Sequence, residues 1–439
     1  MISRTYGQGA KRLISLGEMK PVDFTGFTFR RGPKTHDLRN RRPHPGSLGG
    51  RRAALRRRDS EMAPEAIEIA QNGLEVWRCR LEVASCKNQF MRTGYDAVNQ
   101  TFMAAEIMET GAVVRRQLAA NAASIAEVAA NLRARKPSFV ATIARGSSDH
   151  AALYLKHLVE LKVALACASL APSIASLYHA PLKLTGAVAV SISQSGRSPD
   201  IVAMQRTASH ERAMTVALVN DEASPLARGA DALVPLHAGA ERSVAATKSM
   251  IASLVAAAAL AAHWSEDNEL LAALAGLPSV LDRSSGAPPA AVIETLAKAS
   301  SLFVIGRGAT HAVAAEAALK LKETCAIHAE AFSSAEVLHG PAGVIGPGFP
   351  VLAFAPTDAA RPGFFDTLDR LAAFGAAPLV VDIEPHRRWP TLVAIDGGHP
   401  LLTPIVALHA FYRIAETTAR RRGRDPDEPP HLTKVTQTV

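Results

Sequence analysis

Short apolar runs alternate with Ala-rich stretches from about residue 139 onward, and these runs form two series. The strands expected in the first series are 139–143, 187–192, 215–219 and 232–235. Those expected in the second are 302–305, 350–354, 378–382 and 392–395. Apolar strands that alternate with helical stretches are typical of a parallel sheet covered by helices. Each series therefore predicts one parallel α/β domain.

The two series repeat one another at an offset of about 162 residues, the distance between Arg145 and Arg307. Arg145-Gly-Ser-Ser follows the first strand of its series, and Arg307-Gly-Ala-Thr follows the first strand of the other. The simplest explanation is a duplicated domain. The sequence predicts two tandem flavodoxin-like domains, each a parallel sheet with helices on both faces.

The helical pattern predicts where the folded part begins and how it divides. Residues 103–132 are expected to form its first helix. Residues 250–262 are a run of 13 uncharged, mostly apolar residues, short of the roughly 20 that cross a bilayer, and predict a buried helix. We expect a first domain at 103–280, a second at 281–423 and a C-terminal tail at 424–439.

The net charge of +9 is confined to the N-terminal quarter. Residues 1–102 contain 19 Lys and Arg against 10 Asp and Glu, whereas the other 337 residues contain 30 of each. A nucleic-acid-binding arm and an import signal would both use such Arg-rich sequence. The favoured interpretation is a mostly disordered extension that is translated from upstream of the true initiator. We therefore expect that the protein has no nucleic-acid partner and that its activity does not need residues 1–102.

The composition of the whole chain is that of a globular protein, with 48% apolar and 20% charged residues. Its four cysteines, Cys79, Cys86, Cys167 and Cys325, include no CxxC pair and no cluster with histidine. Neither a disulfide framework nor a metal site is predicted, and the reducing cytoplasm is the expected location. No cofactor and no membrane association are expected.

Hydroxyl-rich loops follow two strands of the first series. Ser147 and Ser148 follow its first strand, and Ser193-Gln194-Ser195-Gly196-Arg197-Ser198 follows the second. Each loop leads into a helix, whose free N-terminal amides favour a phosphate dianion. Simple helix capping is the alternative for either loop alone. Because the corresponding loop of the second series, Ala355-Pro356-Thr357, has lost most hydroxyls, one phosphate site per chain is predicted.

The densest set of polar residues lies at 311–345. Glu316, Lys320 and Glu323 fall at i, i+4 and i+7, on one face of an expected helix over 312–324. A polar loop is expected beyond it, with His328, Glu330 and Glu336, and it ends in His339-Gly-Pro. A solvated Glu–Lys ladder is the alternative interpretation of the helix face.

These segments resemble the sugar isomerase (SIS) domain proteins, above all the isomerase half of glutamine:fructose-6-phosphate amidotransferase and the related glucosamine-6-phosphate deaminases. The resemblance spans roughly residues 105–439. Six motifs carry it in order: RGSS at 145–148, SQSGRS at 193–198, ERSVAATK at 241–248, EAALKLKE at 316–323, EVLHGP at 336–341 and DPDEPPHLTK at 425–434.

The resemblance implies a role for each matching residue. The phosphate of a sugar would be held by Ser148, Ser193, Gln194, Ser195 and Ser198. Glu323 would move a proton between sugar C1 and C2, His339 would open the pyranose ring, and Lys434 would lie near the open-chain carbonyl. Supporting positions would be Ser147, Glu241, Val244, Glu316 and Lys320. The family also implies a homodimer in which His339 completes the partner subunit's active site.

The branch of the family is indicated by departures from the amidotransferase pattern. Ile2 follows Met1 and the first cysteine is Cys79, so no N-terminal cysteine nucleophile is available and no glutaminase activity is expected. Arg145 replaces the Cys of the amidotransferase Cys-Gly-Thr-Ser loop. We therefore expect a deaminase that converts glucosamine 6-phosphate into fructose 6-phosphate and ammonia. Alternatives are an enzyme for another amino-sugar or ketosamine phosphate and a sugar-phosphate-sensing regulator.

Overall fold

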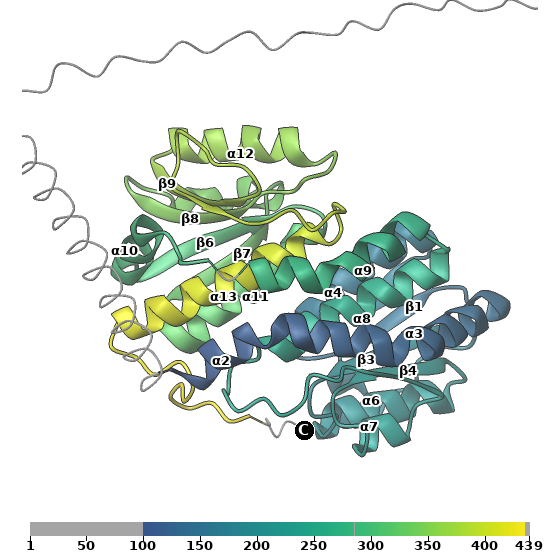
Figure 1. Cartoon of the computed structure of the whole chain (residues 1–439). Helices are drawn as coiled ribbons and strands as arrows, with labels where there is room; N and C mark the ends of the chain where they lie inside the picture. Colours follow the sequence, from purple (N-terminus) through teal and green to yellow (C-terminus); the bar gives the residue numbers. More distant parts are fainter. Residues whose placement is uncertain (1–99, 285, 435–439) are drawn as a thin grey trace, which may run out of the picture. The chain divides into compact units, whose positions relative to one another are not determined.

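The computed structural model describes residues 100–284 and 286–434, so the expectations for the N-terminal segment lie almost wholly outside the described residues. Two five-stranded sheets form the described part, and all their strand pairs are parallel (Figure 1). The first sheet contains β1 (Val140–Ile143), β2 (Cys167–Ser169), β3 (Val188–Ser193), β4 (Met214–Val219) and β5 (Ala232–Pro235). The second contains β6 (Ser301–Gly306), β7 (His328–Ser333), β8 (Phe349–Phe354), β9 (Ala376–Asp382) and β10 (Thr391–Val393).

Both sheets have the same strand order. It is β2-β1-β3-β4-β5 in the first sheet, and β7-β6-β8-β9-β10 in the second. This is the flavodoxin-like order. The predicted duplication of a flavodoxin-like domain is confirmed.

The sequence interpretation missed one strand in each copy, β2 and β7. Both lie at the edge of their sheet and have one neighbour, so neither needs a continuous apolar run. In β2 only Cys167 is buried, and in β7 Ala329 is buried between the exposed His328 and Glu330. The expectation of a polar loop at His328 and Glu330 is therefore wrong, because both belong to an edge strand.

The helices of the first copy include α2 (Phe102–Met108), α3 (Thr110–Arg135), α4 (Ser147–Leu158), α5 (Ser173–Ser176), α6 (Pro199–His210), α7 (Pro225–Arg228), α8 (Lys248–Ser265) and α9 (Asn268–Arg283). The π-helical turn η1 (Val159–Val163) extends α4. The single helix predicted over 103–132 is two helices that meet at Glu109. Helix α2 packs on the C-terminal helix α13 (Thr403–Arg421), whereas α3 packs on α8 and α9.

The second copy adds α10 (Ala290–Lys298), α11 (Ala309–Cys325) and α12 (Arg361–Ala373) to α13. The short 3-10 helices η2 (Glu336–Leu338) and η3 (Pro341–Val344) connect β7 to β8. The predicted domain boundary after residue 280 falls in the last turn of α9, and the chain then passes to α10.

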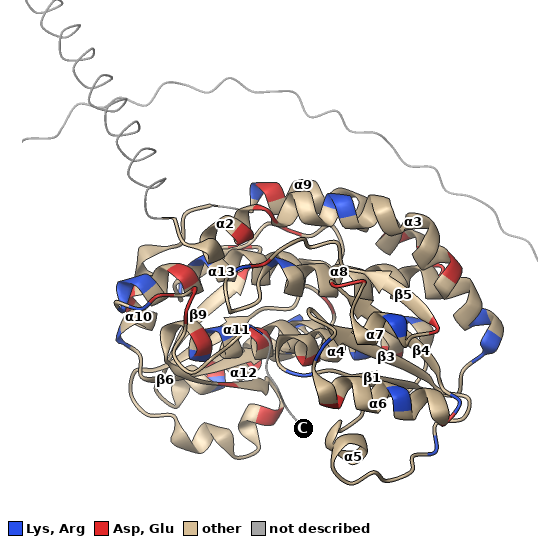
Figure 2. Ribbon diagram, turned by 90° about the horizontal axis from the view of Figure 1, so that it is seen from below, with Lys and Arg blue, Asp and Glu red and all other residues tan. Residues whose placement is uncertain are grey.

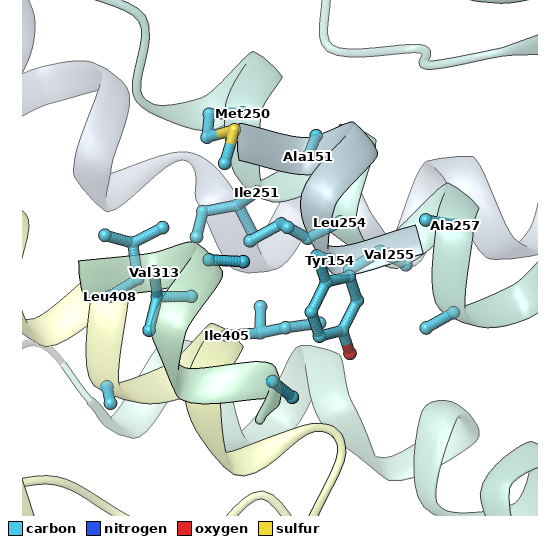
Figure 3. Packing of buried hydrophobic residues seen from close by; sticks show 14 of the residues in the cluster. Ala151, Tyr154, Met250, Ile251, Leu254, Val255, Ala257, Val313, Ile405 and Leu408 are labelled. Atoms are coloured by element: carbon cyan, nitrogen blue, oxygen red, sulfur yellow. The ribbon is translucent and has the colours of Figure 1, made fainter. Parts of the chain in front are cut away.

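One apolar core joins the two copies. Its residues come from the inner faces of both sheets and from α4, α8, α11 and α13, which lie between the sheets (Figure 1). Figure 3 shows Tyr154 of α4 packed among Leu254 of α8 and Ile405 of α13. The Tyr154 hydroxyl donates to the carbonyl of Leu401, so this aromatic ring ties a helix of the first copy to the second.

Helix α8 is the buried helix predicted over 250–262. Lys248 is its one Lys, Arg, Asp or Glu, so the ribbon of α8 is almost free of charged positions (Figure 2). Nearly every other residue of the helix is buried. No helix within 100–284 and 286–434 is long and apolar enough to cross a membrane.

The outer face of each sheet is covered by its own helices. In the first copy α6 and α7 pack there, with Ile201, Met204 and Leu226 among the buried residues. In the second, α12 contributes Phe364, Leu368 and Leu371. Helices on both faces of each sheet confirm the predicted layers.

Candidate active site

A cavity of about 340 Å³ lies at the carboxyl ends of the first sheet. Five chain segments line it: the loop from β1 to α4, the loop from β3 to α6, the connection from β5 to α8, helix α11, and the end of the described C-terminal tail. Nine residues predicted from the sequence are among its lining: Ser147, Ser148, Ser193, Gln194, Ser195, Ser198, Val244, Glu323 and Lys434. The fold thus brings together side chains that are up to 287 positions apart, from Ser147 to Lys434.

The β1–α4 loop turns sharply at Gly146. This glycine has φ +57°, in the left-handed region that favours glycine, and Gly308 of the second copy has φ +58° at the matching turn. The turn ends β1 and starts α4 at Ser147, so the first amides of α4 reach the cavity edge.

The β3–α6 loop offers hydroxyls and amides to the cavity. Gly196 N donates to Ser193 Oγ over 3.0 Å, which folds the loop back on itself. Ser198 stands at the N-cap of α6 without using its side chain as a cap, and Pro199 follows. These features fit an anion, because the Ser193 and Ser195 hydroxyls accept from the loop and keep their own hydrogens to donate, and they lie beside the N-terminus of a twelve-residue helix.

Glu316 and Lys320 form a buried ion pair beneath the cavity. Both side chains are at most 1% exposed, and Lys320 Nζ lies 3.3 Å from Glu316 Oε1. Lys320 also donates to Glu323, whose side chain is 20% exposed and faces the cavity. The solvated ladder that the spacing alone would allow is therefore wrong, and the helix face is an internal network that ends at Glu323.

Burial opposes the charges of this network, but its partners outweigh burial. Burial alone would raise the pKa of Glu316, yet Lys320 and His150 hold that pKa below its usual value. Burial alone would lower the pKa of Lys320, yet Glu316 and Glu323 raise it above its usual value. The pair therefore remains ionised at neutral pH.

Two residues of this network were missed by the sequence interpretation. His150 Nδ1 lies 2.8 Å from Glu316 Oε2, and the Tyr412 hydroxyl donates to Glu316 Oε1 over 3.4 Å. Ser147 Oγ also donates to Glu316 Oε1, over 3.0 Å. His150 lies one helical turn beyond Ser147, so its spacing was a usable signal. Tyr412 has no such signal, because only tertiary packing brings α13 to α11.

Lys434 is held at the cavity by Glu241. Its Nζ donates to Glu241 Oε2 over 2.8 Å and to the carbonyl of Ser243 over 2.7 Å. Glu241 is fully buried; burial would raise its pKa, but Lys434 and the Ser249 hydroxyl hold that pKa below its usual value. The carboxylate therefore positions the lysine of a tail that would otherwise be solvated.

His339 does not join the other predicted catalytic residues within one chain. It is exposed, lies between η2 and η3, and is absent from the cavity lining. The predicted contribution of His339 to a partner subunit's cavity stays a prediction.

The cavity lining combines hydroxyl, amide, carboxylate and cationic groups with the apolar side chains of Val244, Ala246 and Leu432, so a small ligand with several polar groups could bind there. Within the described part of the chain, no group of three or more His, Cys, Asp or Glu side chains could hold a metal ion. Both described cysteines, Cys167 and Cys325, are buried and unpaired.

The SIS domain family model matches residues 135–263 and 295–390, one segment in each copy. The chain belongs to this family. A curated relative is glutamine–fructose-6-phosphate aminotransferase (isomerizing) of Symbiobacterium thermophilum, which is 33% identical over 402 residues. That match covers 85% of this chain and 64% of the relative, so the chain spans less than two thirds of that relative's length.

Solved structures agree with this family assignment. A protein from Silicibacter pomeroyi, named as a presumed phosphosugar isomerase, is 47% identical, with a TM-score of 0.71. That similarity covers 74% of this chain and all of the other. Glucosamine-6-phosphate deaminase from Thermotoga maritima shares the fold at 20% identity, with a TM-score of 0.62 over 77% of this chain and all of the deaminase.

Proposed function

We propose that this protein is an isomerising deaminase that converts glucosamine 6-phosphate and water into fructose 6-phosphate and ammonia, without glutamine hydrolysis. The observation that carries the proposal is the cavity itself. A hydroxyl-rich anion site, the Glu323 carboxylate and the Lys434 amine all line one space, as phosphosugar isomerisation requires. Relatives named for amino-sugar phosphate chemistry support the substrate class.

Glu323 is proposed to move the proton. After the ring opens, its carboxylate removes hydrogen from C2 and returns it to C1, so the C1 aldehyde becomes an alcohol and the C2 amine becomes an imine. Water then adds to C2 and ammonia leaves, which yields the ketone of fructose 6-phosphate. Lys320 donates to the Glu323 carboxylate and thereby fixes its orientation.

Ring opening is proposed to depend on a second copy of the chain. The partner subunit's His339 would carry the proton between the ring oxygen and the C1 hydroxyl, because imidazole can accept and donate a proton near neutral pH. The exposed position of His339 outside its own chain's cavity supports this arrangement. The protein would accordingly act as a homodimer with two shared sites.

Lys434 is proposed to stabilise the open-chain sugar. A lysine ammonium can attract a carbonyl oxygen as negative charge develops on it during enolisation. The Glu241 carboxylate and the Ser243 carbonyl take two of its donors, which leaves one for the substrate.

The absence of glutamine hydrolysis is proposed from the loops of this cavity. Arg145 and the Arg197-Ser198-Pro199 run depart from the amidotransferase pattern and look like the deaminase branch. A deaminase for another amino-sugar or ketosamine phosphate would use the same groups, so substrate comparison must decide between them.

The test is to incubate the full chain with glucosamine 6-phosphate, with galactosamine 6-phosphate, and with fructose 6-phosphate plus ammonium or glutamine. Ammonia and hexose phosphate are measured in each. We expect ammonia and fructose 6-phosphate from glucosamine 6-phosphate, slow reversal with ammonium, and no use of glutamine. Turnover of galactosamine 6-phosphate alone would favour the other substrate, and saturable binding without turnover would favour a sensor.

A further inference from the structure

Arg145 is a cation of the cavity lining with most of its donors unused. Its side chain is 53% exposed, and Nε donates to Asp200 Oδ2 over 3.1 Å. Among the described residues, this is the one hydrogen bond that the Arg145 guanidinium makes to the protein. A guanidinium has five N–H donors, so four remain for a ligand.

Asp200 fixes where those donors lie. It is the second residue of α6, its side chain is 1% exposed, and its Oδ1 accepts from Ile201 N over 2.9 Å. The carboxylate therefore holds Arg145 of the β1–α4 loop against the N-terminal end of α6, beside Ser198. A phosphate bound in the β3–α6 loop would lie at this same helix end.

The charge balance of the cavity calls for such a cation. A sugar phosphate brings about −1.5 to −2 charges at neutral pH, whereas the β3–α6 loop offers mainly uncharged donors. Every nearby cation has a carboxylate partner, but the others are held by more contacts: Lys434 by Glu241 and Ser243, Lys320 by Glu316 and Glu323, and Arg197 by two hydrogen bonds to Asp221. Arg145 makes one hydrogen bond within the described part of the chain, to Asp200.

We infer that Arg145 binds the phosphate group of the substrate through its terminal nitrogens, and that Asp200 is the positioning residue that aims it. The inference rests on the proposed function, because it assumes that the ligand is a sugar phosphate. An arginine suits this task, since its planar fork can bind two phosphate oxygens at once.

The second copy provides a matched control. Arg307 holds the same place in its motif, but its Nη1 donates to Ser333 Oγ over 3.0 Å, and the loop after β8 has one hydroxyl, that of Thr357. Arg307 does not line the cavity. Substitution of Arg145 should therefore weaken phosphate binding, whereas substitution of Arg307 should leave it unchanged.

The first measurement compares wild type, Arg145→Ala and Arg307→Ala. The KM for glucosamine 6-phosphate and the inhibition constant of inorganic phosphate should both rise on the order of 10- to 100-fold in Arg145→Ala, as for lost charge-assisted hydrogen bonds, with a much smaller change in kcat. Arg307→Ala should match wild type. A raised KM with an unchanged inhibition constant for phosphate would place Arg145 on another part of the substrate and overturn the inference.

Removing Arg145 also leaves the Asp200 carboxylate unpaired near the anion, and its repulsion alone could weaken binding. The double variant Arg145→Ala with Asp200→Asn separates the two effects, because it removes both charges. Binding that stays weak supports direct contact with the phosphate. Recovery to the wild-type constant would show that Arg145 only neutralises Asp200, which overturns the inference.

Two further controls keep the result decisive. Arg145→Lys preserves the positive charge and replaces Arg145→Ala if the alanine variant does not fold. We expect phosphate to inhibit Arg145→Lys less strongly than wild type, though the loss should be smaller than in Arg145→Ala. Inhibition equal to that of wild type would contradict the inference. Calorimetric titration of wild type with fructose 6-phosphate checks the assumption that the ligand is a sugar phosphate. Absent binding there would refute the proposed function, whereas normal binding in both wild type and Arg145→Ala would refute the Arg145 inference alone.

Discussion

The two SIS copies share a backbone plan but differ in what their loops carry. Both sheets have the same strand order, and both place a glycine at φ near +58° before the first helix that covers the sheet. Both also keep an arginine–aspartate pair at the carboxyl edge, Arg197 with Asp221 and Arg361 with Asp382. The strand order, the glycine turn and the arginine–aspartate pair are therefore present in both copies.

The chemical groups have been divided between the copies. The loop after β3 keeps the hydroxyls that suit a phosphate, whereas the loop after β8 reads Ala355-Pro356-Thr357. The helix α11 of the second copy instead carries Glu316, Lys320 and Glu323 toward the first copy's cavity. Under the proposed function, one copy binds the anion while the other supplies the acid–base group.

The largest expected effect is the loss of the Glu323 carboxylate, to which the proposed function assigns the proton transfer. Glu323→Gln keeps the side-chain shape and removes the base, so kcat should fall by about 10²- to 10⁴-fold with little change in KM. Glu330→Gln, at an exposed position of the edge strand β7, is the matched control and should retain wild-type kcat. Steady-state kinetics on glucosamine 6-phosphate provide the measurement, and an active Glu323→Gln protein would contradict the division of roles.

The next effect concerns the buried ion pair Glu316–Lys320 within α11. Glu316→Gln leaves Lys320 with Glu323 as its one carboxylate partner among the described residues and should lower the free energy of unfolding by up to about 3–5 kcal/mol. The pKa of Glu316 is below its usual value, so the stability gained from its charge is present above the usual pKa of 4.5 and is lost as the pH falls toward the native pKa. Denaturant unfolding between pH 7 and pH 3 should therefore show a smaller acid loss in the variant than in wild type. Equal pH profiles would contradict the role given to the pair.

A smaller effect should separate the hydroxyls of the two loops. Ser195→Ala should raise KM by about 10- to 100-fold and change kcat less, because phosphate binding is largely the same in ground and transition states. Thr357→Ala removes the hydroxyl of the second copy's loop and should leave both constants unchanged. Equal effects of the two substitutions on KM would mean that the copies are not functionally different.

Mixed dimers test whether the acid–base group and the ring-opening histidine come from different chains. Glu323→Gln and His339→Ala proteins are each expected to be nearly inactive. Random subunit exchange between them should restore about a quarter of the wild-type sites, since half the dimers are mixed and one site of each mixed dimer is intact. Persistent inactivity after exchange, verified by mass spectrometry of the dimers, would argue for a site within one chain.

The sequence predicts features that depend on residues close together in the chain, and misses those that depend on contacts between distant segments. The interior strands, α8 and the cavity-lining serines carry local apolar or loop patterns, so they were found. The edge strands β2 and β7 were missed because half-exposed strands need little apolar sequence. The buried contacts of Tyr412 with Glu316 and of Lys434 with Glu241 arise only when distant segments fold together, and spacing along the chain does not encode them.

The central claim is that Glu323 moves the proton between C1 and C2, and hydrogen exchange at C2 tests it most directly. Wild-type protein, Glu323→Gln and His339→Ala are incubated in D₂O with an open-chain analogue of glucosamine 6-phosphate that cannot form the pyranose ring. Nuclear magnetic resonance then follows the C2 hydrogen. We predict exchange in wild type and in His339→Ala, which acts one step earlier, and very slow exchange in Glu323→Gln. Exchange at the wild-type rate in Glu323→Gln would contradict the account.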